Sequence, residues 1–410
     1  MSPVTAPHAI AGPTASSRDP LGIRRQVRES IAAVGRIRLL DFLLFAALAF
    51  PQPIGGAGIA YDLLAVAAIS CLALFRRPRR DLSWVQPLIP LFVAALLYLA
   101  VVSSFAVPTE EASDWHRRLL RLVLMTGFAF MISSGRIDLR SGVFGLATSL
   151  LVNAPLFYAG LVPDTYDGYL TGILLDKNYA GLVYCVVGVA LLGVLRSPRL
   201  RAMSFVGFAG LLWLTGSRTS LAAFAAATLW MLIAPRLPLI GRAILGVLIY
   251  TGVNLMSEDF SQVGAFSNRV GSDLLRSRID AASQIKVGGS GFFGLGLGEA
   301  YVSINDQHWF FHNSYWSAQV EGGWPWLLFV VGVTVLLVIR PFQRPMSLGD
   351  AAVQGAGVAL LVCAWRLGEV FYTLPWALVL GLAIEHCSPP LHDDGMRPLL
   401  RASSGRAWGR

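Results

Sequence analysis

Polar and aromatic side chains gather in one short stretch of an otherwise apolar chain, FFHNSYWSAQVEGGWPW at residues 310–326. His312 and Asn313 stand side by side there, and Glu321 and Pro325 lead into an apolar run. An imidazole titrates near neutral pH and is the usual general base for a hydroxyl group. His312 is therefore a candidate catalytic base. The alternative is an interfacial histidine in a belt of aromatic rings, with Glu321 capping the next helix and Pro325 in its first turn.

A second polar break, GSRTS within LLWLTGSRTSLAAF at residues 211–224, places Arg218 between two apolar runs. A charge at the centre of a bilayer costs about 2.5–3.5 kcal/mol on insertion scales unless it faces water or a partner. Because the turn is so short, we expect Arg218 near a membrane boundary. A guanidinium there suits the oxygens of a lipid diphosphate. The alternative is an arginine that extends to the lipid headgroups.

The segment GILLDKNYAG, residues 172–181, brings Asp176, Lys177 and Asn178 together at the start of another apolar run. A lysine is a point charge suited to an anion. An aspartate or asparagine at this place can instead cap the helix that follows. The segment therefore predicts a helix start, with Lys177 as a candidate anion ligand.

A polar stretch, SNRVGSDLLRSRIDAASQI at residues 267–285, predicts an amphipathic helix lying on the membrane surface. Its polar side would carry Arg269, Arg276 and Asp280, with Arg278 nearer the flank. Solvation of these charges is the alternative to binding an anion. The glycine-rich segment that follows, GGSGFFGLGLGEAY, lacks the spacing of a dinucleotide-binding loop and predicts a flexible or tightly turned connector.

The sequence predicts no metal, cofactor or nucleic-acid site. His308 and His312 are four residues apart, but no carboxylate–histidine repeat accompanies them. The chain has no nucleophile elbow for a Ser-His-Asp triad and no basic patch with interleaved aromatic residues. Its four cysteines fall in or beside apolar segments without CxxC spacing, so we expect small core residues.

The elements that must position these residues are predicted to be membrane helices. Of the 410 residues, 55% are hydrophobic and 14% are charged, against roughly 25% charged in soluble proteins. Apolar stretches near the ~20 residues that cross a bilayer recur throughout, which predicts an all-α polytopic membrane protein. The candidate spans, about twelve, are 39–55, 57–75, 84–106, 118–135, 141–161, 178–195, 202–216, 220–235, 239–256, 322–339, 349–365 and 369–385.

Basic residues orient the predicted spans. With the N-terminus inside, the inward segments carry 23 of the 33 Lys and Arg residues, and the positive-inside rule then predicts that both termini are cytoplasmic. The expected organisation is a cytosolic tail 1–38, a bundle 39–256, a large outward loop 257–321, a second bundle 322–385 and a cytosolic tail 386–410.

The cations on the outward side run against this bias, so each needs a reason. Some could bind an anionic substrate at the outer leaflet. The alternative is pairing with acids on the same side, namely Glu110, Glu111, Asp164, Asp280 and Glu369. The outward cations are Arg117, Arg118, Arg121, Lys177, Arg218, Arg269, Arg276, Arg278, Lys286 and Arg366.

Taken in order, DKNYAG, GSRTS, the arginine-bearing loop helix with GFFGLGLGEAY, and HNSYWSAQVEGGWPW resemble the O-antigen ligase/polymerase superfamily. The likeness covers roughly residues 170–340, and the first half matches only as a series of spans. The resemblance implies a glycosyltransferase-C-like bundle of about a dozen spans with a large periplasmic loop. It also implies a multi-pass protein of the bacterial inner membrane whose active site faces the periplasm.

The resemblance further implies metal-independent, inverting transfer of an undecaprenyl-diphosphate-linked glycan to a sugar hydroxyl, without a cofactor. By matching motif, His312 would take the proton of the acceptor hydroxyl, and Arg218 and Arg278 would hold the donor diphosphate, with Lys177 beside them. The loop helix lacks the aromatic residue that often follows the arginine in the family, so Arg276 remains the alternative to Arg278. The supporting positions are Arg276, Asn313, Asp176, Asn178, Glu321 and Arg366.

Two envelope reactions share this donor. The expected one is polymerisation of exopolysaccharide or O-antigen repeat units, and the alternative is ligation of a glycan to lipid A–core in lipopolysaccharide biosynthesis. The expected partners are the lipid-linked donor, a glycan or lipid-linked glycan acceptor and the bilayer, with envelope polysaccharide assembly proteins as candidates. The rival from another class is a transporter or flippase, which would bury ionisable groups near mid-membrane in two related halves. The informative charges cluster at the outer boundary instead.

Overall fold

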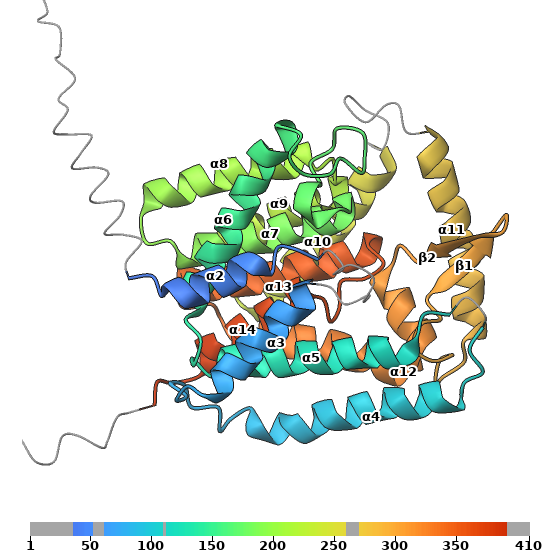
Figure 1. Ribbon diagram of the computed structural model, residues 1–410, viewed down its shortest axis with the longest axis horizontal. Coiled ribbons are helices and arrows are strands. Elements are labelled where there is room, and N and C mark those ends of the chain that lie inside the picture. Colours follow the sequence, from blue (N-terminus) through green and yellow to red (C-terminus); the bar gives the residue numbers. More distant parts are fainter. Residues whose placement is uncertain (1–35, 52–60, 110–111, 260–269, 392–410) are drawn as a thin grey trace, which may run out of the picture.

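The computed structural model describes residues 36–51, 61–109, 112–259 and 270–391, and helices dominate them (Figure 1). The elements, in chain order, are α2 Leu39–Ala47, α3 Tyr61–Leu74, η2 Gln86–Leu88, α4 Ile89–Phe105, α5 Trp115–Ser133, α6 Leu139–Tyr158, η3 Gly172–Leu174, α7 Lys177–Val194, α8 Pro198–Leu214, α9 Arg218–Ile233, η4 Ala234–Arg236, α10 Leu239–Asp259, α11 Val270–Gly289, β1 Tyr301–Ile304, β2 Gln307–Phe310, α12 Ser314–Val333, η6 Thr334–Ile339, α13 Leu348–Arg366 and α14 Leu374–Cys387.

Six helical segments in the described residues are long and apolar enough to cross a membrane: Gln86–Phe105, Leu139–Tyr158, Lys177–Val194, Arg218–Arg236, Ser314–Ile339 and Leu348–Arg366. The mostly helical fold is compatible with the predicted all-α membrane protein. Each of the twelve predicted spans overlaps a helix, but α2 has only nine residues and α5 opens with the basic sequence WHRRLLR. The number of crossings therefore stays a prediction.

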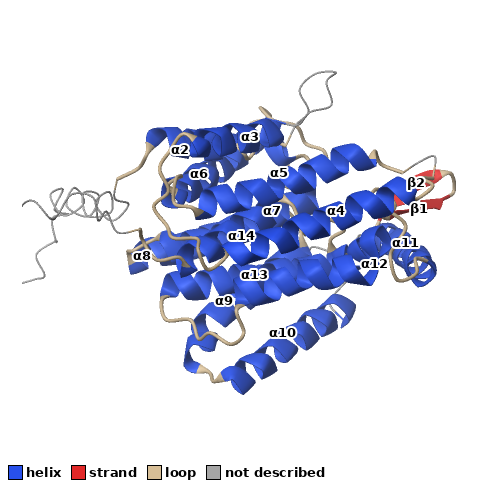
Figure 2. Ribbon diagram, turned by 90° about the horizontal axis from the view of Figure 1, so that it is seen from below, coloured by secondary structure: helices blue, strands red, loops and turns tan. Residues whose placement is uncertain are grey.

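The helices α7 and α13 lie at the centre of the bundle, with other helices around them (Figure 2). Small residues explain how closely their neighbours approach. A Cβ added at Gly193 of α7 would lie 2.6 Å from the Cβ of Ala352 on α13, and one added at Gly355 would lie 2.9 Å from the carbonyl oxygen of Ala227 on α9. Glycine and alanine at such contacts let helix backbones pack tightly where lipid offers no hydrophobic driving force.

The predicted loop 257–321 is largely structured in its described part. It holds the end of α10, then α11, the hairpin β1–β2 and the start of α12. The hairpin turns at Asn305 and Asp306, which both have positive φ, as in the type I′ turns common in two-residue hairpins. A small separate core joins α11 to the hairpin and α12 through Ile279, Val302 and Phe311.

The helix α11 differs in part from the prediction of a surface amphipathic helix. Ile279 is 1% exposed and packs with the hairpin, whereas Leu274 is 55% exposed and Ile285 is 79% exposed. The buried stripe therefore continues through Leu275 and Ala282, at the three- and four-residue steps of one helix face. The hairpin and α12 cover this stripe, so a lipid surface is not needed to bury it.

The helix α12 begins at Ser314, eight residues before the predicted span 322–339. The predicted helix start falls instead on a kink, where Gly322 and Gly323 have non-helical backbone angles and Gly323 has a φ of 64°. Pro325 follows in the first turn after the kink, where proline is tolerated. The glycine-rich connector packs here and is tightly turned, since Leu295 N donates to the carbonyl oxygen of Val320 at 2.6 Å.

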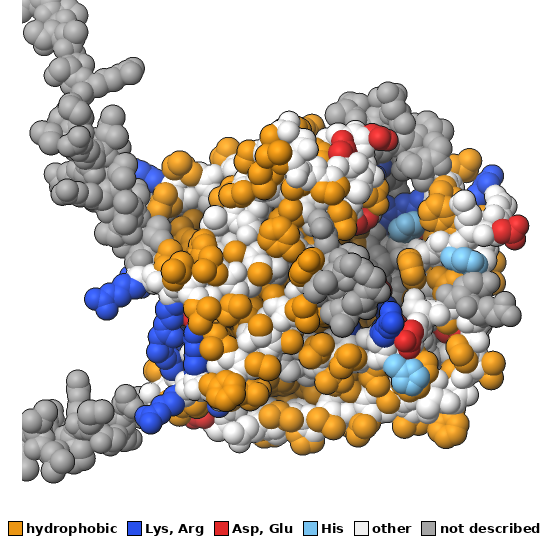
Figure 3. Space-filling view, in the orientation of Figure 1, with side chains coloured by type: hydrophobic (Ala, Val, Ile, Leu, Met, Phe, Trp, Pro, Cys, Tyr) orange, Lys and Arg blue, Asp and Glu red, His pale blue; other side chains and the backbone are white. Residues whose placement is uncertain are grey.

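The two ends of the bundle carry different groups. The helix α11 and the hairpin lie at one end (Figure 1), where charged side chains and histidines appear on the surface (Figure 3). At the opposite end the first and last described parts of the chain lie close together, since Arg38 and Leu391 line one cavity. Between the two ends the surface is mostly apolar (Figure 3), with Leu97, Val206 and Val247 each more than 60% exposed. A surface of this kind marks a membrane or protein contact.

Candidate functional site

The candidate base, His312, lies between β2 and α12, at the end of the bundle that carries α11. Its neighbour Asn313 caps α12, because the Asn313 side-chain oxygen accepts hydrogen bonds from Tyr315 N at 2.9 Å and Trp316 N at 3.2 Å. The cap fixes the backbone that carries the imidazole. Asn313, predicted as a supporting residue, therefore has a structural role here.

Asp280 of α11 faces His312, and their Nδ1 and Oδ1 atoms are 3.7 Å apart. The imidazole is 29% exposed and the carboxylate 27%. Within the described residues these two atoms are buried and make no hydrogen bond. A contact of this length is within ion-pair range. With Nδ1 turned to the carboxylate, Nε2 is the ring atom left for a hydroxyl.

Arg276 lies one helical turn before Asp280, so both side chains stand on the same face of α11. An Nη2–H of Arg276 donates to the carbonyl oxygen of Arg366, the last residue of α13. The side chain of Arg276 and the main chain of Arg366, both predicted as supporting residues, thus come together beside the His312–Asp280 pair.

Arg278, the sequence-based choice for the diphosphate ligand, is exposed on α11, whereas Arg276 is half-buried. Residues two positions apart on a helix point in directions that differ by about 200°. Only one of Arg276 and Arg278 can therefore face α13. The hydrogen bond to Arg366 shows that it is Arg276.

Serine side chains join the start of α12 to the turn after α13. Ser314 Oγ donates to the carbonyl oxygen of Leu367 at 2.5 Å and accepts from Val370 N at 3.0 Å, and Ser317 Oγ donates to Gly368 O at 2.9 Å. A Cβ at Gly368 would lie only 1.8 Å from the carbonyl oxygen of Phe311. The segment that carries His312 is therefore fixed against the segment that follows Arg366.

Glu321 is buried and belongs to an ion network that reaches the surface. Arg118 of α5 contacts it through Nε at 2.7 Å and reaches Glu369 through Nη1 at 2.5 Å, and Arg121 contacts Glu369 at 3.2 Å. Glu321 also accepts from Gly298 N at 3.1 Å. Arg118 and Arg121 thus pair with Glu369, as the pairing alternative predicts. Glu321 connects α5 and the glycine-rich segment to the kink of α12.

A similar pair holds the connector from its other side. Lys286 Nζ lies 3.0 Å from an oxygen of Glu299, and Thr109 N donates to the same carboxylate at 2.9 Å. Burial alone would raise the pKa of Glu299, but the hydrogen bonds from Thr109 and the Lys286 ammonium lower it below its usual value. Lys286 is therefore an anchor of the connector.

Asp176, Lys177 and Asn178 form the start of α7. Asp176 caps the helix, accepting from Asn178 N at 2.9 Å and Tyr179 N at 2.7 Å, so the capping alternative describes it. Lys177 Nζ lies 5.1 Å from the ring centre of Tyr166, and the Tyr166 hydroxyl donates to Asp176 at 2.7 Å. Lys177 therefore lies against an aromatic ring at the first residue of α7. The positive end of the helix dipole also favours an anion at this place.

Arg218 is the first residue of α9 and is half-buried. The start of α9 packs against the start of α7, since a Cβ at Gly181 would lie 2.5 Å from Ser220 Oγ. Gly193 near the end of α7 meets Ala352 near the start of α13, so α13 runs antiparallel to α7. Lys177 and Arg218 therefore lie at the level where α13 ends at Arg366.

An apolar groove of about 390 Å³ reaches the same level. It lies between α10, α9 and α13 and extends from Arg242 and Pro341 to Tyr315 and Trp365. Trp365 directly precedes Arg366, and its ring centre is 6.0 Å from that of Tyr315. The groove escaped prediction from the sequence because its residues come from several separate segments, with α10 and α13 far apart in the chain.

No protein-family model matches this chain, and no curated protein is significantly similar to it. Within the described ranges no three His, Cys, Asp or Glu side chains are grouped so that they could hold a metal ion.

Proposed function

We propose that this protein is a multi-pass glycosyltransferase of the bacterial inner membrane. It transfers an undecaprenyl-diphosphate-linked glycan to a sugar hydroxyl on the periplasmic side. The observation that carries the proposal is the convergence of a histidine–carboxylate pair, His312 and Asp280, with the guanidinium of Arg276, which the main chain of Arg366 holds in place. A base and a set of fixed cations are what transfer from a diphosphate needs, because the first activates the hydroxyl and the second hold the leaving group.

In the proposed reaction the acceptor hydroxyl loses its proton to His312 Nε2 as its oxygen attacks the anomeric carbon of the donor. The bond from that carbon to the diphosphate oxygen breaks, and the electron pair leaves with undecaprenyl diphosphate. Attack opposite the leaving group inverts the anomeric centre. Asp280 stabilises the imidazolium that forms, as a carboxylate 3.7 Å away can. Arg276, Arg218 and Lys177 hold the developing charge on the diphosphate.

The apolar groove supports the same function, because a polyprenyl tail must lie within the bilayer while its diphosphate stays at the boundary. The groove is about 390 Å³ and ends at Tyr315 and Trp365, next to the residues that would hold the diphosphate. Its length along α10 and its aromatic walls suit an unsaturated hydrocarbon chain. Arg276 takes the place of Arg278 in this proposal, since Arg276 is the arginine beside Arg366.

The topology is part of the proposal. Twelve spans with both termini in the cytoplasm put the arginine-rich end inside, and the end with α11 and His312 in the periplasm. No nucleotide is present there, so the energy comes with the donor. We favour polymerisation of repeat units; ligation to lipid A–core remains the alternative and uses the same donor end.

Purified protein in liposomes, given lipid-linked repeat units and no nucleotide, tests the function. We expect chain growth or release of undecaprenyl diphosphate. His312→Ala should lower turnover by roughly 10²–10⁴-fold, the usual contribution of a general base. His308→Ala is the matched control, because His308 is exposed on β2 and contacts Ser303. Movement of donor between leaflets without transfer would replace the enzyme with a flippase, and near-normal turnover of His312→Ala would remove it from the mechanism.

A further inference from the structure

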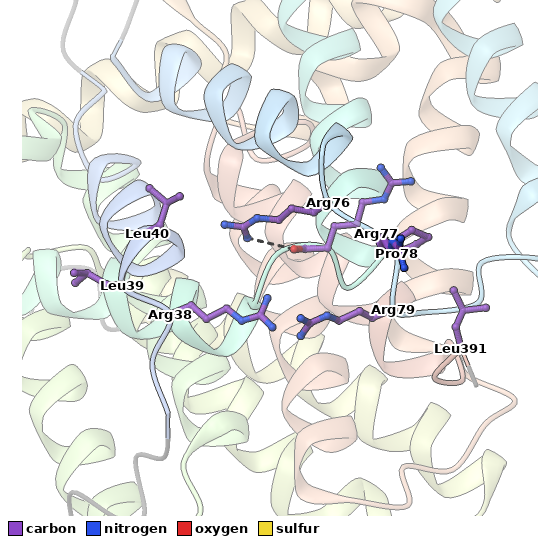
Figure 4. A pocket seen from close by; sticks show the side chains of 9 residues that line it. Arg38, Leu39, Leu40, Arg76, Arg77, Pro78, Arg79 and Leu391 are labelled. Atoms are coloured by element: carbon purple, nitrogen blue, oxygen red, sulfur yellow. Dashed lines mark hydrogen bonds between the residues drawn. The ribbon is translucent and has the colours of Figure 1, made fainter. Parts of the chain in front are cut away.

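A second cavity, of about 990 Å³, opens at the end of the bundle opposite His312 (Figure 4). Five arginines line it: Arg38, Arg76, Arg77, Arg79 and Arg136. They come from the start of α2, the connection between α3 and α4, and the turn between α5 and α6. Three segments distant in sequence thus bring their positive charge to one space.

Three of these five arginines have no neutralising partner among the described residues. Arg76 forms an ion pair with the buried Asp41 at 2.6 Å, and Arg136 donates to the carbonyl oxygen of Ala73 at 3.0 Å. Within the described part of the chain, the guanidinium groups of Arg38, Arg77 and Arg79 have no carboxylate or hydrogen-bond partner. Figure 4 shows Arg38 and Arg79 pointing toward one another across the cavity.

The backbone that carries these arginines is nevertheless fixed. Arg79 N donates to the carbonyl oxygen of Ser134 at 2.9 Å, and Leu391 N donates to the carbonyl oxygen of Arg79 at 2.9 Å. Arg38 N is held by Ser141 Oγ at 2.9 Å. Fixed main chain with unpaired guanidinium groups is the arrangement expected of a preformed anion site, since little order is lost when a ligand binds.

Apolar side chains border the cavity on one side. Leu39 is 68% exposed and Leu40 is 50% exposed, both in the first turn of α2. A ligand that covers them together with the arginines must carry both a hydrocarbon part and negative charge. Phosphate oxygens match the guanidinium fork, and acyl chains match the leucines.

We propose that this cavity binds the phosphate headgroup of an anionic phospholipid from the adjacent leaflet, with acyl chains against Leu39 and Leu40. The proposal rests on the chain being a membrane protein and is independent of glycosyl transfer. The positive-inside rule explains why this end of the bundle is rich in arginine. It does not explain why the arginines meet in one cavity beside exposed leucines.

Binding of phosphatidylglycerol to the full-length protein in detergent tests this site, with phosphatidylcholine and inorganic phosphate as further probes. The variant Arg77→Gln/Arg79→Gln removes two unpaired cations around Pro78. Its matched control is Arg196→Gln/Arg199→Gln, two exposed arginines around Pro198, the first in the connection between α7 and α8 and the second in the first turn of α8. We expect the first pair to weaken phosphatidylglycerol binding on the order of tenfold, and the control to leave it unchanged.

Phosphatidylcholine should bind weakly to either protein, and inorganic phosphate should not displace phosphatidylglycerol at equal concentration. Equal losses in the two double variants would overturn the site in favour of general charge attraction. Phosphate binding as tight as the lipid would make the ligand a soluble anion and overturn the lipid assignment. If Arg77→Gln/Arg79→Gln has a lower unfolding temperature, Arg38→Gln replaces it, with the same expected and contrary results.

Discussion

The two ends of the bundle both concentrate charge, but they hold it differently. At the end with His312, two of the cations are paired with buried or half-buried acids: Arg118 with Glu321 and Glu369, and Lys286 with Glu299. At the other end, Arg38, Arg77 and Arg79 have no side-chain partner among the described residues. Paired, buried charge fixes one geometry, whereas unpaired charge keeps its affinity for a ligand. This contrast fits the two proposals, in which one end carries out glycosyl transfer and the other binds a lipid headgroup.

The largest loss of stability is expected when Arg118 is replaced. Arg118→Gln leaves Glu321 buried without its cation, and removing one partner of a buried pair costs about 3–5 kcal/mol. We expect a large fall in the unfolding temperature measured in detergent. Arg117→Gln is the control, because Arg117 is 77% exposed and contacts only Asp114 at 3.5 Å in the described structure. Similar unfolding temperatures for the two variants would mean that the network at this end is no more rigid than a surface pair.

The next effect separates the two arginines of α11. Arg276→Gln should lower turnover by about 10²–10³-fold, the usual loss when a fixed donor to a developing negative charge is removed. Arg278→Gln, on the exposed side of the helix, should stay within about twofold of the parent. Turnover with lipid-linked donor measures both. A larger loss at Arg278 would restore the choice made from the sequence and would place the donor on the other face of α11.

A third variant tests how tightly the segment bearing His312 is held. Gly368→Ala puts a methyl group 1.8 Å from the carbonyl oxygen of Phe311, so the backbone before His312 must move. Overpacking of this kind costs about 1–3 kcal/mol of stability. We expect turnover to fall even at temperatures where the variant is still fully folded. Gly332→Ala on α12 is the control, because nothing lies within 4 Å of an added Cβ there. Full activity of Gly368→Ala would show that the position of His312 is not critical.

The helical class and the order of the helices followed from the sequence because long apolar runs have few other solutions in a membrane. The caps at Asp176 and Asn313 were also open to prediction, since capping depends on residues next to one another. The start of α12 was placed eight residues late because polar residues such as Ser317 and Glu321 interrupt the apolar pattern. They are tolerated in the helix because the α13–α14 turn and Arg118 satisfy them.

Three features of the site could not be predicted from the sequence. The pairing of Asp280 with His312 and the approach of Arg276 to Arg366 depend on how α11 packs against α12 and α13. The phase of α11 about its axis decides whether Arg276 or Arg278 faces the site, and it is set by Ile279 in the small core. These contacts join segments far apart in the chain, so local patterns do not contain them.

The smallest expected effect is a pH dependence of stability that comes from Glu369, one of the paired acids at the end with His312. Arg118 and Arg121 lower the pKa of Glu369 to about 2, against the opposing effect of burial. The unfolded carboxyl, at its ordinary pKa of 4.5, binds its proton more readily than the folded one. The stability that Glu369 contributes is therefore complete above about pH 4.5 and is lost as the pH falls toward 2. Glu369 is 39% exposed, so solvent screening keeps the effect small.

Unfolding temperatures measured from pH 6 to pH 3 test this dependence. Glu369→Gln should start lower at pH 6 and fall less on acidification than the parent, because it has no charge to lose. Asp306→Asn, in the exposed hairpin turn, is the control and should follow the parent curve. Parallel curves for the parent and Glu369→Gln would show that the pairing of Glu369 with Arg118 adds nothing to stability. The buried contact of Arg118 with Glu321 would then have to account for the rigidity of this end alone.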